Sequence, residues 1–164
     1  MARFLIPLSL GCEELEAVTV IDLLRRAGVD VVTAGLEEGL VKCSRGTVIM
    51  PDTVLDEVLG ESFDMIVLPG GLPGADHLDA DARIHRLLRD MAEQGRYTAA
   101  ICAAPKVLGS AGLLDGRTAT SYPGILEGGN FGLTSLSSQP VVRDGAVITS
   151  RGPGTAMDFA LELI

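Results

Sequence analysis

Hydrophobic positions follow two patterns along the chain, short unbroken apolar runs and longer segments in which apolar residues recur at helical spacing. The short runs predict strands at residues 4–8, 29–34, 63–68, 98–101, 118–121, 140–143 and 146–150. The helical spacing predicts helices at residues 13–26, 51–59, 81–93, 103–112 and from 155 onward.

Strands and helices therefore alternate, which is typical of an α/β protein with an open, mostly parallel sheet covered by helices on both faces. Two short extended pieces are expected at 40–43 and 47–50, and an irregular segment at 124–138. Asp144-Gly145 predicts the loop of a hairpin near the end of the chain. Since no linker or repeat interrupts the pattern, we expect a single domain over residues 1–164.

The composition of the chain limits which partners it can bind and which cellular compartment it is expected in. The net charge of −9 argues against general nucleic-acid binding and against anionic membranes, since both carry phosphates. No apolar run is long enough to span a membrane, and the first run, interrupted by Pro7, predicts a strand rather than a lipoprotein signal. The cysteines Cys12, Cys43 and Cys102 form no Cys-x-x-Cys or histidine cluster, so we expect no disulfide framework, no zinc site and a reduced, cytoplasmic setting.

Cys102 stands where a buried strand is predicted to run into a helix. The N–H groups of a helix start favour a thiolate, and the small neighbouring residues leave the sulfur accessible, as in a nucleophile elbow without the Gly-x-Ser-x-Gly motif. The alternative is a buried structural cysteine. Residues 11–16 and 69–71 also follow strands, so they are expected at the same sheet edge as Cys102, which favours a functional cysteine.

A reactive thiolate needs hydrogen-bond donors for its substrate and a group that moves protons. The free N–H groups of Gly71 and Ala103 can supply an oxyanion hole. The two histidines, His77 and His85, do not follow the cysteine directly, which argues against a papain-like hydrolase.

Glutamates are the better candidates for proton transfer. Glu13, Glu14 and Glu16 occupy the first turns of one predicted helix, where helical spacing points them in different directions. A carboxyl group that points toward the thiol is expected to have a raised pKa and to shuttle a proton. The residues by themselves leave open which of the three it is.

Several motifs, in the same order along nearly the whole chain, resemble the ThiJ/PfpI superfamily, and within it the branch of the parkinsonism-associated protein DJ-one and its bacterial relatives. The motifs are Gly-Cys-Glu-Glu-Leu-Glu at 11–16, Ile-Asp-Leu-Leu-Arg-Arg-Ala-Gly at 21–28, Cys-Ser-Arg-Gly at 43–46, Asp-Met-Ile-Val-Leu-Pro-Gly-Gly at 64–71, Ala-Ala-Ile-Cys-Ala-Ala-Pro at 99–105 and Thr-Ser-Arg-Gly-Pro-Gly-Thr at 149–155.

The resemblance implies a flavodoxin-like three-layer sandwich, usually a homodimer, with no metal or organic cofactor. It implies that Cys102 is the reactive, oxidation-prone cysteine, that a protonated Glu16 hydrogen-bonds it, and that Gly71 and Ala103 are the backbone donors. Further positions near the pocket are Gly70, Glu13, Arg45, Tyr122, Ser150, Arg151 and Pro153, whereas Arg26 is expected to be structural. Family members usually continue beyond Ile164, so a C-terminal helix is expected to be missing from these residues.

For activity, the resemblance implies a glutathione-independent glyoxalase or protein deglycase that protects against stress, acting on small 2-oxoaldehydes or on glycated proteins and nucleotides. The alternative is a redox sensor or chaperone in which Cys102 oxidises to a sulfinate, and a third reading is a degenerate site. Ala103 replaces the histidine of the protease-like branches, which argues against a peptidase. Tyr122 replaces a histidine of the human protein's relatives, which implies hydrogen bonding rather than proton transfer.

Overall fold

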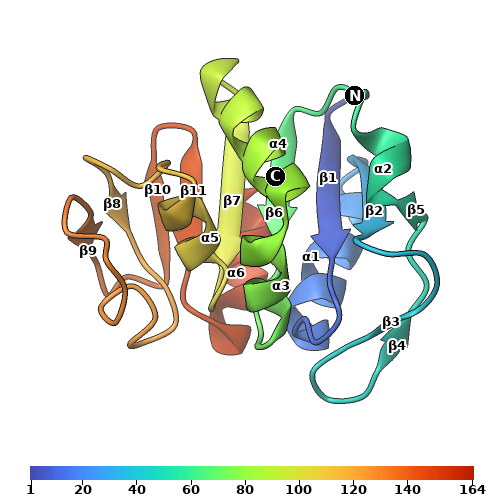
Figure 1. The fold of residues 1–164 in the computed structure, drawn as a ribbon, viewed down its shortest axis with the longest axis horizontal. Coiled ribbons are helices and arrows are strands. Elements are labelled where there is room, and N and C mark those ends of the chain that lie inside the picture. The colour runs from blue at the N-terminus through green and yellow to red at the C-terminus, as the bar shows by residue number, and fades with distance from the viewer.

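The computed structural model describes residues 1–164 and has a seven-stranded sheet at its centre (Figure 1). The strand order is β10-β11-β7-β6-β1-β2-β5, and every neighbouring pair is parallel except β10 and β11. The strands of this sheet are β1 (Arg3–Leu8), β2 (Asp30–Gly35), β5 (Thr53–Val54), β6 (Met65–Leu68), β7 (Tyr97–Ile101), β10 (Val141–Asp144) and β11 (Val147–Ser150).

Two small sheets lie outside it. One is an antiparallel pair, β3 (Val41–Lys42) and β4 (Val48–Ile49), and the other a parallel pair, β8 (Thr118–Ala119) and β9 (Ser135–Leu136).

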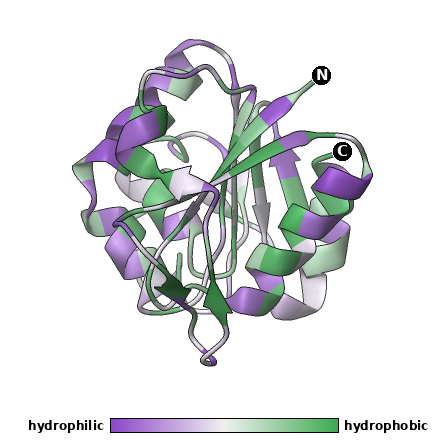
Figure 2. Ribbon diagram, turned by 90° about the vertical axis from the view of Figure 1, so that its right-hand side faces the viewer, coloured by the Kyte–Doolittle hydropathy of each residue, from purple (hydrophilic) through white to green (hydrophobic).

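Helices cover both faces of the central sheet, so the predicted three-layer α/β architecture is confirmed (Figures 1 and 2). One face carries α1 (Glu14–Arg26) and α6 (Ala156–Glu162), preceded by the single 3-10 turn at Pro153–Thr155. The other face carries α2 (Leu55–Val58), α3 (Gly74–Ala80), α4 (Ala82–Glu93) and α5 (Pro105–Ser110). None of these helices has both the length and the apolar character needed to cross a bilayer.

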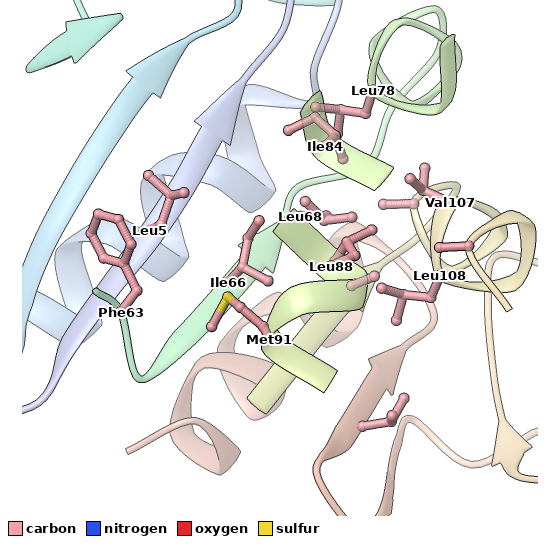
Figure 3. Packing of buried hydrophobic residues seen from close by; sticks show 14 of the residues in the cluster. Leu5, Phe63, Ile66, Leu68, Leu78, Ile84, Leu88, Met91, Val107 and Leu108 are labelled. Carbon is pink, nitrogen blue, oxygen red and sulfur yellow. The ribbon is translucent and has the colours of Figure 1, made fainter. Parts of the chain in front are cut away.

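The sheet separates two apolar cores, which explains why its strands are continuous apolar runs. Along β1, Leu5 belongs to the core under α3, α4 and α5, while Phe4 and Ile6 belong to the core under α1 and α6. In the first core Ile66 of β6 lies beside Met91 of α4 (Figure 3). Both cores are filled mainly by Leu, Ile, Val and Ala, as a sheet with two covered faces requires.

The structure corrects several element boundaries. The helix expected at 51–59 is an edge strand followed by a single turn of helix, because Asp52 is tied to β2. Its Oδ2 accepts hydrogen bonds from the N–H (2.9 Å) and Oγ1 (2.8 Å) of Thr33. Helix α3 was not predicted, and it lies between the glycine turn at 69–71 and the helix predicted at 81–93.

Near the end of the chain, residues 118–121 do not join the central sheet, because only Thr118 and Ala119 are extended and they pair with β9. Strand β9 itself falls inside the segment expected to be irregular. The predicted hairpin is present, but Asp144 pairs with Val147, so its loop is Gly145-Ala146 rather than Asp144-Gly145.

The strand order places a topological switch point between β1 and β6. The chain leaves β1 through α1 toward β2 on one side, and leaves β6 through α3 and α4 toward β7 on the other. The carboxyl ends of these strands lie at the lower edge of the sheet in Figure 1. Ligands of open α/β sheets bind at such a point, and here the residues that follow β1, β6 and β7 meet.

We predict that Gly70→Ala lowers the free energy of unfolding by about 1–3 kcal/mol, because the added methyl group has no room. Its Cβ would stand 2.5 Å from the carbonyl oxygen of Ile101 and 2.6 Å from the Cβ of Cys102. Gly60→Ala is the matched control, since no atom lies within 4 Å of its added Cβ. Chemical denaturation measures both variants, and equal stability of the two would contradict the crowding at Gly70.

Candidate functional site

Cys102 forms the turn between β7 and α5, and its backbone has an unusual conformation. Its φ of +65° is the only positive φ of a non-glycine residue in the chain. The turn is held by two hydrogen bonds, from Cys102 N–H to the Ser150 carbonyl (3.0 Å) and from Tyr122 N–H to the Cys102 carbonyl (2.7 Å). The helix therefore begins at Pro105 rather than at residue 103, and the strained elbow holds the thiol at the sheet edge.

Two glycines after β6 let the first turn of α1 approach this elbow. Gly70 donates its N–H to Glu16 Oε1 (3.1 Å), and its carbonyl accepts from the N–H of Glu13 (2.9 Å). Gly71 has a φ of +85°, and a Cβ there would stand 2.5 Å from the Glu13 nitrogen. Larger residues would thus separate the carboxyl group from the thiol.

Glu16 is the carboxyl group that points into the protein. It is fully buried, and its Oε2 has no hydrogen-bond partner of ordinary geometry. Burial raises the pKa of Glu16 to about 7, although hydrogen bonds from the Cys102 thiol and the Gly70 N–H partly oppose that shift. Glu13, by contrast, caps α1 by accepting a hydrogen bond from the N–H of Leu15 (3.3 Å).

The thiol of Cys102 is less acidic than the sequence predicts. Burial and then the negative charge of Glu16 raise the pKa of Cys102 to about 12. Hydrogen bonds from the N–H groups of Gly71 and Ala103 to the sulfur lower the pKa of Cys102, but by less. Because the charge of one group disfavours the charge of the other, the pair holds one proton over a wide pH range.

A cavity of about 280 Å³ opens over Cys102. Most of the residues predicted to lie near the pocket line it, namely Glu13, Arg45, Gly71, Cys102, Ala103, Tyr122 and Pro153. Ser44, Leu72 and Ile125 also line it and were missed. Ser44 could have been found from its place between Cys43 and Arg45 in a quoted motif, whereas nothing in the sequence singles out Leu72 or Ile125.

Other predicted residues lie elsewhere. Ser150 is buried and donates to the Pro140 carbonyl (2.7 Å), and Arg151 donates to Thr120 Oγ1 (3.0 Å), so both hold loops together and neither lines the cavity. Gly70 acts through its backbone under Glu16. Arg26 makes a surface ion pair with Asp22 (2.9 Å) and does not line the cavity.

Polar contacts tie the loop between β3 and β4 to the start of α1. Ser44 Oγ donates to Glu13 Oε2 (3.1 Å), and Arg45 N–H donates to Glu14 Oε2 (3.2 Å). Because Glu13, Ser44 and Arg45 all line the cavity, these contacts hold one of its walls in place.

A larger cavity, of about 350 Å³, lies beside His77 and Leu10. The imidazole Nδ1 there is bonded to the Leu10 carbonyl (2.9 Å), and no cysteine, serine or threonine lines that space. Nowhere in the structure do three or more His, Cys, Asp or Glu side chains gather as metal ligands. The Cys102 cavity is therefore the best-supported site for chemistry.

We predict that Glu16→Gln removes a pH dependence of stability. In the wild type the folded state holds the Glu16 proton more tightly than the unfolded state, so stability is full below about pH 4.5 and is lost as the pH rises through about 7. This loss amounts to about 3 kcal/mol. The free energy of unfolding of both proteins, measured against pH, should diverge over this range.

Asp22→Asn, at an exposed position of the same helix, is the control and should leave the pH dependence unchanged. Parallel curves for the wild type and Glu16→Gln would show that the buried carboxyl group does not carry the proton.

Comparisons with known proteins agree with this geometry. The model of the DJ-1/PfpI family matches residues 2–164. Protein dj-1beta of Drosophila melanogaster is 45% identical over 160 residues, which cover 97% of this chain and 86% of that protein. The crystal structure of Drosophila melanogaster DJ-1beta superposes with a TM-score of 0.95 at 44% identity and covers 99% of this chain and 88% of the other. A Caenorhabditis elegans protein named glutathione-independent glyoxalase DJR-1.2 is 38% identical over 152 residues, covering 93% of this chain and 81% of that one. The chain belongs to the DJ-1/PfpI family.

Proposed function

We propose that the protein is a cysteine-dependent glyoxalase that works without glutathione on small 2-oxoaldehydes. The observation that carries this proposal is the pairing of the Cys102 thiol with the buried carboxyl group of Glu16 under a small cavity. The name of the Caenorhabditis elegans relative supports the same class of reaction.

The reaction begins with the transfer of charge to sulfur. When Glu16 holds the shared proton, Cys102 is a thiolate and attacks the aldehyde carbon of the substrate. Glu16 then gives its proton to the resulting oxyanion, which completes the hemithioacetal and leaves Glu16 as a carboxylate. The N–H groups of Gly71 and Ala103, which already face the sulfur, lie where they can stabilise the developing oxyanion.

Glu16 then moves a proton between neighbouring carbons. As a carboxylate it removes the proton from the former aldehyde carbon, which gives an enediolate, and as a carboxylic acid it returns that proton to the adjacent carbon. The hydroxyl proton on the former aldehyde carbon passes to the former ketone oxygen, which leaves a 2-hydroxy thioester on Cys102. Water hydrolyses this thioester, releases the 2-hydroxy acid and restores the thiol. A pKa of about 7 suits both directions of this transfer near neutral pH.

The cavity limits what reaches the sulfur. Its volume of about 280 Å³ suits a substrate of a few carbon atoms, and Tyr122 is placed to offer a hydrogen bond rather than a proton. Arg45 and Tyr122 line the cavity and are both exposed to solvent. The cavity is therefore open enough there to admit early glyoxal adducts that are attached to larger molecules. Deglycation would use the same groups, and homodimer formation stays a prediction from the family resemblance.

A redox sensor is the second candidate, and the same donors favour it. Oxidation of Cys102 to a sulfinate places two oxygens near the Gly71 and Ala103 N–H groups, and a protonated Glu16 can donate to one of them. Sulfinate formation at Cys102 without turnover would support this candidate.

We predict that Cys102→Ser lowers methylglyoxal turnover by at least about a thousandfold and Glu16→Gln by about a hundredfold or more. The first change removes the nucleophile, and the second removes the proton carrier but keeps the hydrogen bond from Gly70. Methylglyoxal loss and lactate formation without glutathione measure both.

Cys43→Ser is the matched cysteine control, since its thiol does not line the cavity, and it should retain turnover. Wild-type turnover no greater than that of Cys102→Ser would rule out the glyoxalase for this substrate.

We also predict that kcat/KM rises about tenfold per pH unit below pH 7 and levels off above it. Below a pKa of about 7 the Glu16–Cys102 pair holds two protons and no thiolate, whereas above it one proton leaves. Initial rates with methylglyoxal on both sides of neutrality measure this profile. In Glu16→Gln the inflection near pH 7 should disappear, and its persistence would assign the titration to another group.

A further inference from the structure

Two cysteines that the mechanism does not use lie against each other. The Sγ atoms of Cys12 and Cys43 are 3.7 Å apart, both side chains are buried, and both thiols are free. The two residues are 31 positions apart in the sequence. They belong to the core under α1 and α6, beside the loop that follows β1.

The backbone holds the two cysteine segments together. Gly11 N–H donates to the Lys42 carbonyl (2.8 Å), and Ser44 N–H donates to the Cys12 carbonyl (2.8 Å). One hydrogen bond therefore lies on each side of the sulfur pair. Because folding already holds the two thiols close together, forming a bond between them costs little further conformational entropy.

We propose that Cys12 and Cys43 form a reversible disulfide, a second redox site that is chemically separate from Cys102. The sulfur atoms must approach by about 1.7 Å to reach the S–S bond length of about 2.0 Å. Side-chain rotation and a small shift of the β3–β4 hairpin can provide this movement, since only two residue pairs join the strands of that hairpin to each other.

The oxidant is a peroxide or a small disulfide. With hydrogen peroxide, the Cys43 thiolate attacks one oxygen, which gives a sulfenic acid and releases the other oxygen as water. Cys12 then gives up its proton and attacks the Cys43 sulfur, the S–O bond breaks, and the second oxygen leaves as water. Two thiols are oxidised and one peroxide is reduced to two waters.

The surroundings assign the order of these steps and make them slow. Burial raises the pKa of both thiols, and the negative charge of Glu14 adds to this effect at each of them. The Cys12 thiol hydrogen-bonds Cys43 in the sense that lowers the pKa of Cys43, so Cys43 is the first thiolate to form. An oxidant must therefore act for longer than at an exposed cysteine.

The bond would join two residues that precede the cavity wall. Cys12 is followed by Glu13 and Cys43 by Ser44, and those two side chains are hydrogen-bonded to each other in the Cys102 cavity. Oxidation would thus covalently fix the wall that Ser44 and Glu13 already form.

The test is peptide mapping of folded protein in the Cys102→Ser background, which removes oxidation at the other site. Protein is treated with hydrogen peroxide or glutathione disulfide, free thiols are alkylated, and trypsin is added without reductant. The expected product is peptide 4–25 linked to peptide 43–45, because trypsin cleaves after Arg3, Arg25, Lys42 and Arg45. The linked product should be present in most chains, disappear with dithiothreitol and be lost in both Cys12→Ser and Cys43→Ser.

The wild type, mapped in the same way, keeps the test valid if Cys102→Ser folds poorly, and circular dichroism verifies the fold of each sample. The fraction of linked peptide should not depend on protein concentration. The proposal is overturned if both thiols of the folded, oxidant-treated protein remain open to alkylation after denaturation. It is equally overturned if they are oxidised separately, or if the bond joins two chains on a non-reducing gel.

Discussion

The buried carboxyl group of Glu16 is the constraint on which the site depends. A charged carboxylate in the interior costs much of its hydration free energy, so the protein keeps a proton near it and raises its pKa to about 7. The same group accepts the N–H of Gly70 and faces the thiol of Cys102. One side chain therefore connects the segments that follow β1, β6 and β7, and couples their packing to the protonation of the sulfur.

The site also requires the backbone after β6 to pass very close to the elbow at Cys102. The elbow at Cys102 has a positive φ, and Gly70 has no room for a side chain between that elbow and Ile101. The strain stays in place because the hydrogen bonds at Ser150 and Tyr122 hold the turn from both sides. Preorganisation of this kind lets N–H groups face the sulfur before any substrate arrives, so that little reorganisation is left for the reaction.

A second sulfur site lies next to one wall of the cavity, at the same edge of the sheet. Glu13 and Ser44 are hydrogen-bonded to each other in that wall, and the residues that precede them, Cys12 and Cys43, have sulfur atoms within van der Waals distance. The two sulfur sites differ in their neighbours. Cys102 has backbone donors and a carboxyl group that exchanges a proton, whereas the Cys12–Cys43 pair has another thiol at hand. The first environment suits addition to a carbonyl group, and the second suits the formation of a bond between sulfurs.

The sequence by itself determined the layers and the elbow, because a strand buried on both faces must be a continuous apolar run, and because small residues around Cys102 leave few alternatives to a tight strand-to-helix turn. The three glutamates were distinguished only by family resemblance, since helical spacing does not say which direction faces the core. Tertiary structure decided that Glu16 is the buried one, that the thiol is poorly acidic, and that Ser150 supports a loop instead of the cavity. These properties depend on burial and on neighbours that are distant along the chain, and a pattern of residues along one segment contains no information about either.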